Sequence, residues 1–493
     1  MKKTSRAVVI GAGFGGLAAA IRLGARGFDV TVVDKLDKPG GRAYVFEQDG
    51  FVFDAGPTIV TAPFLLEELW ELCGKRLSDD VELVPMQPFY RIRFDDGTHF
   101  DYSGDDDAMR AEIARFSPED AEGYDRLLEA SSLLYEIGFD KLLYTSFDSF
   151  GSMFKAVPDL LRGQFYRSVH SLVQRYIKHP KLRMVFSFHP LLIGGNPFTA
   201  TAIYVLIGQL ERKFGVHFAM GGTGSLVNGM TGLIEGQGGT LRLGETVREI
   251  LVENGRAAGV ELEDGERIAA DVVVSNADSA ATYRHLLPAE HRRRWTDRKL
   301  DRSRYSMSLF VWYFGTNKRF EDVPHHLIMM GPRYRELLDD IFRRKILAED
   351  FSLYLHRPTA TDPSLAPEGC DAFYVLSPVP NLDGETDWTT EAERYRQSIA
   401  RVLDATVLPG LEESVVSSHM ITPIDFKERL FSLKGAAFGL EPVLWQTAWF
   451  RPHNRSEELE GLYLVGAGTH PGAGMPGVIS SAKVLDEVVP DPA

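Results

Sequence analysis

A glycine-rich run near the start of the chain has the spacing of a backbone that binds phosphate. Its members are Gly11, Ala12, Gly13, Phe14, Gly15 and Gly16. Gly11 permits a tight turn, Gly13 lets the backbone approach a pyrophosphate, and Gly16 allows a helix to pack closely on a strand. The run separates a predicted strand at residues 7–10 from a predicted helix at residues 17–25, so the phosphates would lie at the helix N-terminus. It therefore predicts a dinucleotide site.

The second predicted strand ends at Asp34, which is followed by Lys35. This position is about 20 residues beyond the glycines, where a carboxylate can accept hydrogen bonds from an adenosine ribose. FAD and NAD share this pattern, so other residues must distinguish them. Gly40 and Gly41 permit an unusual backbone path directly after the strand, and Arg42 can place a fixed cation on the pyrophosphate.

The order of predicted elements indicates an α/β protein with a discontinuous Rossmann-type domain. A βαβ unit opens the chain, and a helix followed by short strands begins near residue 221. A last strand then leads into a closing helix after residue 465. We predict a nucleotide-binding domain at residues 1–60, 221–290 and 431–493, an inserted mixed α+β substrate domain at 61–115 and 291–430, and a helical, membrane-associating part at 116–220.

The composition excludes several classes of partner. The chain has 54 basic and 69 acidic residues, a net charge of -15, which argues against nucleic acid because phosphate neutralisation needs an excess of Lys and Arg. Cys73 and Cys370 lie far apart and lack metal-type spacing, so we expect neither a disulfide framework nor a metal site. The apolar runs are too short to span a bilayer. These features predict a cytoplasmic protein.

Blocks spread from residue 8 to about residue 484 resemble the carotenoid desaturases, the bacterial phytoene desaturases among them, in the FAD-dependent amine oxidase superfamily. The glycine pair with Arg42 is similar to the motif that marks FAD there. The other blocks are Phe53 to Thr58, Gly194 to Phe198, Trp449 to Asn454 and Leu462 to Gly477. In the last block, a Gly/Pro-rich run enters a helix whose dipole would stabilise charge on a reduced flavin.

The resemblance implies FAD as the cofactor and assigns further residues to it. Asp54, Ala55, Gly56 and Pro57 are expected near the isoalloxazine, and Val247 near the adenine. The resemblance places these residues along the other side of the flavin: Gly468, Thr469, Met475, Pro476, Gly477 and Val478. Thr469 departs from the family pattern, because many relatives have an acidic residue there that binds the ribityl chain.

The resemblance also implies the substrate, 15-cis-phytoene, desaturated in successive steps with lycopene as the expected product. A hydrocarbon offers no hydrogen bonds, so we expect a long apolar cavity. Aromatic stretches at residues 186–188, 310–314 and 351–354 are candidates for its lining, and ordinary core is the alternative role of each. No catalytic base can be named from the sequence. Only one complete dinucleotide fingerprint is visible, so oxygen or a quinone is the expected electron acceptor.

Alternative functions remain open at this point. One is desaturation of a related polyene, such as dehydrosqualene or methoxyneurosporene. A more remote one is flavin-dependent amine oxidation, and another is lipid binding without flavin chemistry in a protein of the same fold. The intact glycine run and the Gly/Pro-rich block favour flavin binding.

A basic stretch from Leu161 to Phe186 suggests how a lipid-dissolved substrate is reached. It combines six Lys and Arg residues with apolar residues in an amphipathic pattern, although the whole chain is acidic. Two interpretations have equal weight: a helix on the inner face of the cell membrane, and a solvated helix packed on the core.

Overall fold

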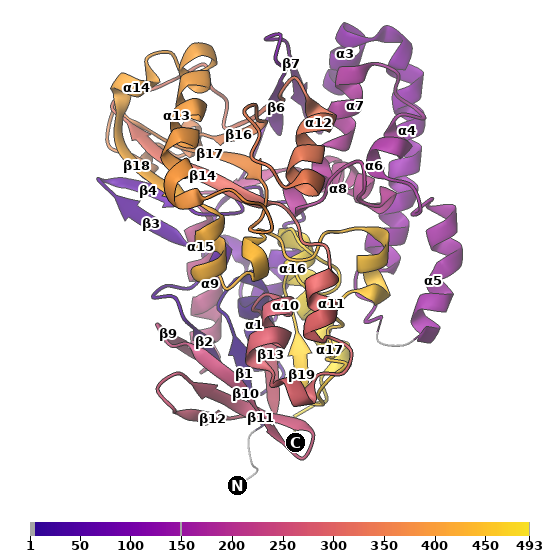
Figure 1. Cartoon of the computed structure of the whole chain (residues 1–493), viewed down its shortest axis with the longest axis vertical. Coiled ribbons are helices and arrows are strands. Elements are labelled where there is room, and N and C mark those ends of the chain that lie inside the picture. The colour runs from indigo at the N-terminus through magenta and orange to yellow at the C-terminus, as the bar shows by residue number, and fades with distance from the viewer. Residues whose placement is uncertain (1–4, 148–149, 493) are drawn as a thin grey trace.

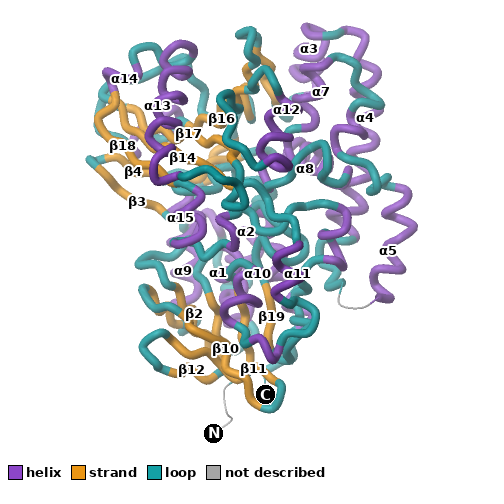
Figure 2. Tube along the Cα trace, viewed as in Figure 1, coloured by secondary structure: helices purple, strands orange, loops and turns teal. Residues whose placement is uncertain are grey.

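The structure, a computed structural model, describes residues 5–147 and 150–492. Two main β-sheets follow one another along the long axis of the molecule, and a group of helices lies beside the upper sheet (Figure 1). Figure 2 shows that the strands gather at the lower end and in the upper left of this view, whereas helices form the right-hand side. The predicted α/β class is therefore confirmed.

The lower sheet is parallel and has the strand order β19-β13-β1-β2-β9. Its strands are β1 (Arg6–Ile10), β2 (Asp29–Asp34), β9 (Thr240–Leu243), β13 (Val272–Ser275) and β19 (Leu462–Leu464). Helix α1 (Phe14–Ala25) packs against both α9 (Thr223–Gly236) and α16 (Met475–Lys483). Because helices cover a parallel sheet, its strands are continuous apolar runs, such as the fully buried β13.

A small antiparallel sheet follows β9. It consists of β10 (Val247–Glu253), β11 (Arg256–Leu262) and β12 (Arg267–Ala269). Asn254 and Gly255 form the first turn with positive φ angles of 51° and 76°, which is the conformation that a two-residue hairpin favours. This is the strand meander that the sequence predicts after residue 240.

The upper sheet has seven strands in the order β18-β14-β17-β16-β15-β6-β7. Their bounds are β6 (Tyr90–Arg93), β7 (His99–Tyr102), β14 (Ser308–Thr316), β15 (His326–Met329), β16 (Leu353–His356), β17 (Asp371–Val379) and β18 (Val415–Ile421). The β6–β7 pair is a hairpin whose turn contains Asp96 and Gly97. The sheet thus joins strands that are separated by about 200 residues of chain.

Strand β14 is buried on both faces, and its side chains alternate between them. Leu309 and Val311 face a cavity on one side. Phe310, Trp312 and Phe314 belong to a separate apolar cluster against α13 (Trp388–Thr406) on the other. The expectation that residues 310–314 as a whole line the substrate cavity is therefore wrong, because the strand alternation turns Trp312 away from it.

The helical part comprises α3 to α8 beside the upper sheet (Figure 1). Its helices are α3 (Asp106–Phe116), α4 (Ala121–Tyr135), α5 (Phe150–Arg162), α6 (Val169–Val173), α7 (Pro180–Ser187) and α8 (Leu206–Phe214). The basic stretch is not one helix. It breaks after Arg162 and again before Pro180, where proline fixes a helix start and keeps His179 extended.

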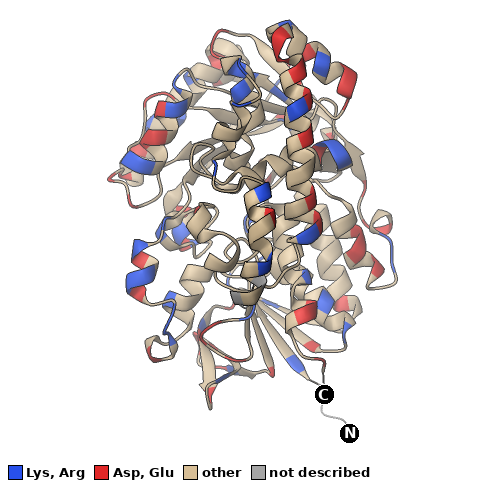
Figure 3. Ribbon diagram, turned by 90° about the vertical axis from the view of Figure 1, so that its right-hand side faces the viewer, with Lys and Arg blue, Asp and Glu red and all other residues tan. Residues whose placement is uncertain are grey.

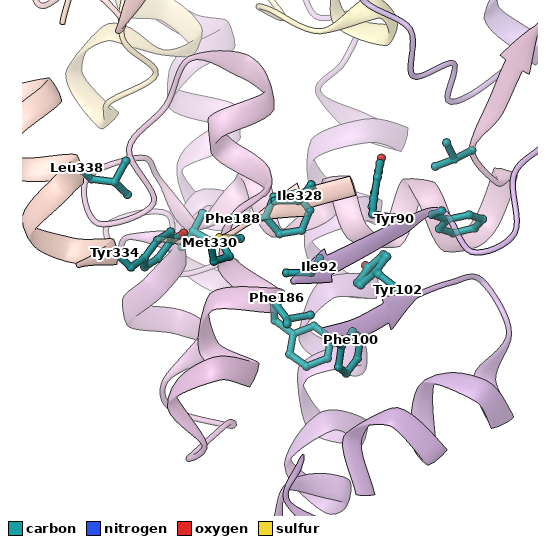
Figure 4. Packing of buried hydrophobic residues seen from close by; sticks show 14 of the residues in the cluster. Tyr90, Ile92, Phe100, Tyr102, Phe186, Phe188, Ile328, Met330, Tyr334 and Leu338 are labelled. Carbon is teal, nitrogen blue, oxygen red and sulfur yellow. The ribbon is translucent and has the colours of Figure 1, made fainter. Parts of the chain in front are cut away.

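The apolar residues of that stretch face the core. Phe165, Val169 and Val173 are buried in a cluster that includes Phe188, Ile328 and Met330. Figure 4 shows part of this cluster, where the Tyr90 and Phe188 rings meet edge to face with centroids 6.0 Å apart. The packed-helix interpretation is the one that fits these side chains.

The remaining elements connect these parts. They are β3 (Val45–Gln48), β4 (Phe51–Asp54), β5 (Leu83–Pro85), β8 (His217–Ala219), α2 (Phe64–Glu71), α10 (Ser279–Ala281), α11 (Asp297–Arg302), α12 (Tyr334–Asp339), α14 (Leu411–Ser414), α15 (Pro423–Glu428) and α17 (Leu485–Val488). Within residues 5–147 and 150–492, no helix combines the length and apolar character needed to cross a bilayer.

Candidate functional site

A cavity of about 880 Å³ is lined by residues of both main sheets. It brings together most of the cofactor residues that the sequence predicts. The predicted residues in its wall are Gly11, Gly13, Phe14, Gly15, Asp34, Lys35, Gly40, Gly41, Arg42, Ala55, Gly56, Pro57, Val247, Met475, Pro476, Gly477 and Val478. Four predicted residues, Gly16, Asp54, Gly468 and Thr469, are not in this wall.

The first glycine turn has the geometry that close approach of a phosphate requires. Gly11 has a φ of 96° and donates its N–H to the Val33 carbonyl at 2.8 Å. Gly13 is the N-cap of α1, so the first N–H groups of that helix lie beside the cavity. A Cβ on Gly16 would lie 1.9 Å from the Gly11 carbonyl oxygen, so only glycine permits this packing of helix on turn.

Asp34 is fixed by backbone donors at the carboxyl end of β2. Its two oxygens accept N–H groups from Ala12 at 2.6 Å and Leu36 at 2.8 Å. Burial raises the pKa of this carboxyl group, while the two N–H donors and Lys35 oppose the rise. Because each oxygen has a further acceptor position, Asp34 can also accept a ribose hydroxyl from the cavity.

Arg42 is held rigidly in the cavity wall. Its Nε donates to the Ala437 carbonyl at 2.7 Å, and its Nη2 donates to Ser432 Oγ at 2.8 Å. Burial lowers the pKa of the guanidinium, and the Asp278 carboxylate partly reverses this. A fixed guanidinium beside a glycine turn fits a pyrophosphate, because little side-chain freedom is lost when the anion binds.

The predicted residues outside the wall have structural contacts. Asp54 Oδ1 accepts the Thr223 N–H at 2.9 Å at the start of α9. Thr469 donates its hydroxyl to the Pro452 carbonyl at 2.6 Å and is fully buried. Gly468 packs against Ser279, which a Cβ would approach to 2.3 Å. These residues position neighbouring backbone behind the wall.

The rest of the cavity is apolar. Its wall includes Phe188, Leu191, Leu192, Ile203, Leu206, Met307, Leu309, Val311, Ile328, Met330, Leu353 and Leu376. Of the aromatic stretches predicted from the sequence, Phe188 and Tyr354 reach it, whereas Phe186 lies in the core. An apolar chamber continuous with such a glycine turn has room for a hydrocarbon beside a dinucleotide.

The chamber also contains two polar groups whose contacts the sequence does not predict. Glu211 of α8 is 1% exposed and accepts the Tyr90 hydroxyl at 2.7 Å, with His189 Nε2 3.2 Å from its other oxygen. Glu211 is followed by Arg212 and Lys213, and such a charged run is typical of a solvent-exposed helix face. The apolar residues one turn earlier, Leu206 and Ile207, were the available signal that this helix face is buried.

The second polar group lies under the upper sheet. Thr58 Oγ1 is 2.7 Å from the Tyr374 hydroxyl and 3.4 Å from that of Tyr354. All three residues line the cavity. Thr58 is the last residue of the predicted block from Phe53 to Thr58, so its position was indicated, whereas its partners lie about 300 residues away in the sequence.

The comparisons with known proteins agree with this geometry. A sequence model of flavin containing amine oxidoreductases matches residues 14–484. The chain is 51% identical to the neurosporene-forming phytoene desaturase of Rhodobacter capsulatus, over 99% of this chain and 94% of that protein. It is 50% identical to the lycopene-forming phytoene desaturase of Pantoea ananas, over 98% of each.

Among solved structures, a variant of putrescine oxidase superimposes with a TM-score of 0.68 over 98% of each chain, at 14% identity. That likeness concerns the fold. The sequence matches are specific and cover nearly the whole chain. The chain therefore belongs to the flavin containing amine oxidoreductase family, in its branch of bacterial carotenoid desaturases.

Proposed function

We propose that this FAD-dependent oxidoreductase desaturates 15-cis-phytoene in successive steps, with lycopene as the product. The observation that carries the proposal is the continuity of one cavity, in which a glycine turn with Arg42 leads into an apolar chamber. The chamber suits a substrate that has no polar atoms, because its recognition must come from shape and buried apolar area.

FAD would be held by the residues that line the polar half of this cavity. Backbone N–H groups at the start of α1 and the fixed Arg42 would hold its pyrophosphate, and Asp34 would accept hydrogen bonds from its adenosine ribose. The start of α16, which has Pro476 in its first turn, would hold the flavin ring, and its helix dipole would stabilise negative charge there. When bound, FAD supplies the acceptor for the hydride that leaves the hydrocarbon. The apolar chamber excludes water from that step.

Repeated desaturation requires the product of one step to stay or to return. The apolar wall gives a polyene no fixed polar anchor, so the chain can slide or reverse within it. This supports successive steps on one substrate. We propose oxygen or a quinone as the final electron acceptor, since one dinucleotide fingerprint leaves no second nicotinamide domain in the sequence.

We propose that the protein works at the inner face of the cell membrane, and that the contact is a rim of exposed apolar residues. Phe154 and Leu161 of α5 are 67% and 63% exposed, and Trp445 is 58% exposed. Their neighbours Met153, Leu160, Leu444 and Phe450 line the cavity, so the rim surrounds a route into it. α5 also contacts the short helical turn at residues 448–450.

The basic stretch supports membrane contact less well. Lys178 and Lys181 form ion pairs with Glu119 and Asp96, and Arg175 donates to Gln164. Figure 3, which faces the helical side, shows basic and acidic residues interspersed along the helices. The electrostatic attraction of such a surface to anionic lipid is weaker than that of an unpaired basic patch.

The test is conversion of phytoene supplied in liposomes by the FAD-loaded protein, with products separated by chromatography. We expect phytoene to disappear and more desaturated carotenes to form in sequence. Gly13→Val protein, which should lack flavin, is the matched inactive control. Protein with a full flavin spectrum that leaves phytoene intact but converts dehydrosqualene or an amine would replace the proposal by one of those functions.

A further inference from the structure

Three histidines form a buried cluster where strands β15 and β16 pair with each other. His326 and His356 are cross-strand partners in the sheet, and His325 directly precedes β15. Their rings are close together, with centroids 4.4 Å apart for His325 and His326 and 5.2 Å for His326 and His356. His325 is 9%, His326 2% and His356 0% exposed.

Each ring has one nitrogen engaged and one nitrogen without a partner. His325 Nδ1 lies 2.6 Å from Thr361 Oγ1, and His326 Nδ1 lies 2.7 Å from the Tyr354 hydroxyl. His356 Nδ1 lies 3.4 Å from His326 Nδ1. The Nε2 atoms of all three rings are buried and have no hydrogen-bond partner. Three adjacent buried rings that each have one unpaired nitrogen require an explanation, because each unsatisfied polar atom destabilises the fold.

We propose that His325, His326 and His356 together bind one imidazole-preferring transition-metal ion, Zn²⁺ or Cu⁺. This departs from the sequence-based expectation of no metal site, which rested on cysteine spacing alone. The cluster is drawn from residues 31 positions apart, so no local motif reveals it. The proposal does not depend on the substrate or on the reaction.

The donor set selects this class of metal. Imidazole nitrogens suit Zn, Cu, Ni and Fe, whereas Mg²⁺ and Ca²⁺ require oxygen ligands. The group that the described residues form consists of imidazoles alone. A hydrogen bond to Nδ1 fixes the ring and leaves Nε2 as the ligand, which is the usual arrangement around metal-bound histidine. His325 and His326 have it already.

The geometry requires a small closure. One ring nitrogen from each histidine lies within 4.8 Å of the other two. Bonds of about 2.0 to 2.1 Å to a tetrahedral metal would bring such nitrogens to about 3.3 Å from one another. For the nitrogens that already lie within 4.8 Å of one another, movements of about 1 Å each are sufficient. With three histidine ligands, the fourth position of a tetrahedral site remains for water.

The electrostatics favour neutral rings. Burial lowers the pKa of His325 to about 3, with a contribution from Arg357, and it holds the pKa values of His326 and His356 well below their usual range. The rings are therefore deprotonated and ready to bind a metal at neutral pH. Arg357 itself is paired with the buried Asp371 at 3.0 Å, which reduces its repulsion of a cation.

The cluster lies directly behind the cavity wall. Tyr354, which is bonded to His326, and Tyr374, whose ring lies 4.8 Å from that of His356, both line the cavity. A metal here would tie β15 to β16 behind the wall of the apolar chamber.

The test measures metal binding by full-length, FAD-loaded protein. Metal content after purification is determined by mass spectrometry, and chelator-treated protein is titrated with Zn²⁺ or, anaerobically with a reductant, with Cu⁺. We expect one equivalent to bind, with X-ray absorption showing imidazole ligands. A preference for either ion supports the site and identifies its metal.

Three variants locate the binding. His326→Gln and His356→Gln should each weaken it by about 100-fold or more, a loss greater than that of an outer-shell partner. His419→Gln, an exposed histidine of the same sheet, should bind as the wild type does. Flavin absorbance and circular dichroism report folding, and His325→Asn, at the most exposed of the three positions, replaces any variant that does not fold. Absence of binding by wild-type protein, or equal binding by the cluster variants, would overturn the proposal.

Discussion

The Asp54 carboxylate accepts the Thr223 backbone N–H at 2.9 Å and thereby joins the end of β4 to the start of α9, 169 residues later in the chain. A carboxylate at a helix N-terminus satisfies an otherwise unpaired donor and interacts favourably with the helix dipole. Asp54 thus holds the segment that continues into Ala55 and Gly56 of the cavity wall, although it is itself outside that wall.

Asp54→Asn should change how stability depends on pH. Burial raises the pKa of Asp54 to about 6, against the opposing effect of the Thr223 N–H. Because the folded pKa exceeds the unfolded value of 3.8, the protonated form favours folding, and that stability is lost as pH rises from about 4 through 6. The difference corresponds to about 3 kcal/mol. Unfolding of FAD-saturated protein between pH 4.5 and 7.5 should show a smaller decline with pH for the variant; identical pH profiles would contradict this assignment.

Gly13→Val should abolish FAD binding while the fold persists. The side chain would project beside the helix start, where a Cβ already lies 2.9 Å from Asn276 Nδ2 and a pyrophosphate must approach. We expect the purified variant to be colourless. Gly232→Ala is the matched control, because a Cβ there meets no atom within 4 Å. Flavin absorbance per chain measures both; full flavin in Gly13→Val would remove this turn from the proposed site.

Local backbone structure is what the sequence predicts best. Gly11, Gly13 and Gly16 act within one strand, turn and helix, so their spacing alone predicts the turn. Asp34 follows the same unit at a fixed distance. The fold class followed for the same reason, since runs of Val at residues 8–9 and 272–274 indicate strands buried on both faces.

The sequence does not predict the role of a side chain when that role depends on packing against distant parts of the chain. The alternation of residues 308–316 predicts two faces, but only the position of α13 decides that Trp312 faces away from the cavity. Glu211 lies in a charged run, and its burial depends on Tyr90, 121 residues away. The basic stretch had an amphipathic composition, yet Pro180 divides it, and its apolar side faces the core.

Polar substitutions in the exposed rim should weaken membrane binding. Leu161→Ser combined with Trp445→Ser removes two large apolar side chains that are each more than half exposed. Each would otherwise contribute about 1.5 kcal/mol or more when buried in lipid. The affinity for liposomes, measured by sedimentation, should fall at least tenfold, with folding unchanged. Val402→Ser, at an exposed position on α13, is the control.

The same assay separates the rim from the basic stretch. Replacement of Arg175, Lys178 and Lys181 by Glu should reduce binding to anionic liposomes mainly at low salt. If this triple variant loses binding at physiological salt and the rim variant does not, the basic stretch is the membrane contact.

Glu211→Ala should destabilise the protein by about 3 kcal/mol, because it leaves the buried Tyr90 hydroxyl and His189 Nε2 without their acceptor. Glu211→Gln, which keeps one acceptor oxygen, should lose only about 1 kcal/mol. Chemical denaturation with flavin saturated measures both, and Glu235→Ala at an exposed helix position should change little. A loss as small for Glu211→Ala as for the control would show that water replaces the carboxylate.

Phe188→Ala should alter the ratio of carotene products without affecting flavin binding. Phe188 is 2% exposed and lines the apolar chamber at a distance in sequence from every predicted FAD contact. Truncation removes apolar contact with the polyene, so partly desaturated intermediates should leave sooner and early products should accumulate. A change of about fivefold in the product ratio corresponds to about 1 kcal/mol of lost contact.

Trp312 provides the control for this experiment. Its indole stacks on Phe314 with centroids 4.2 Å apart and donates to Ser418 Oγ at 2.9 Å, on the face of β14 that packs against α13. Trp312→Phe should therefore leave the product ratio unchanged, although it also makes a buried aromatic side chain smaller. Products are compared by chromatography after expression with a source of phytoene, at equal flavin content. Equal ratios in wild type and Phe188→Ala would place the polyene elsewhere, and a shift in Trp312→Phe alone would mean that packing behind the sheet, rather than the chamber wall, sets the product.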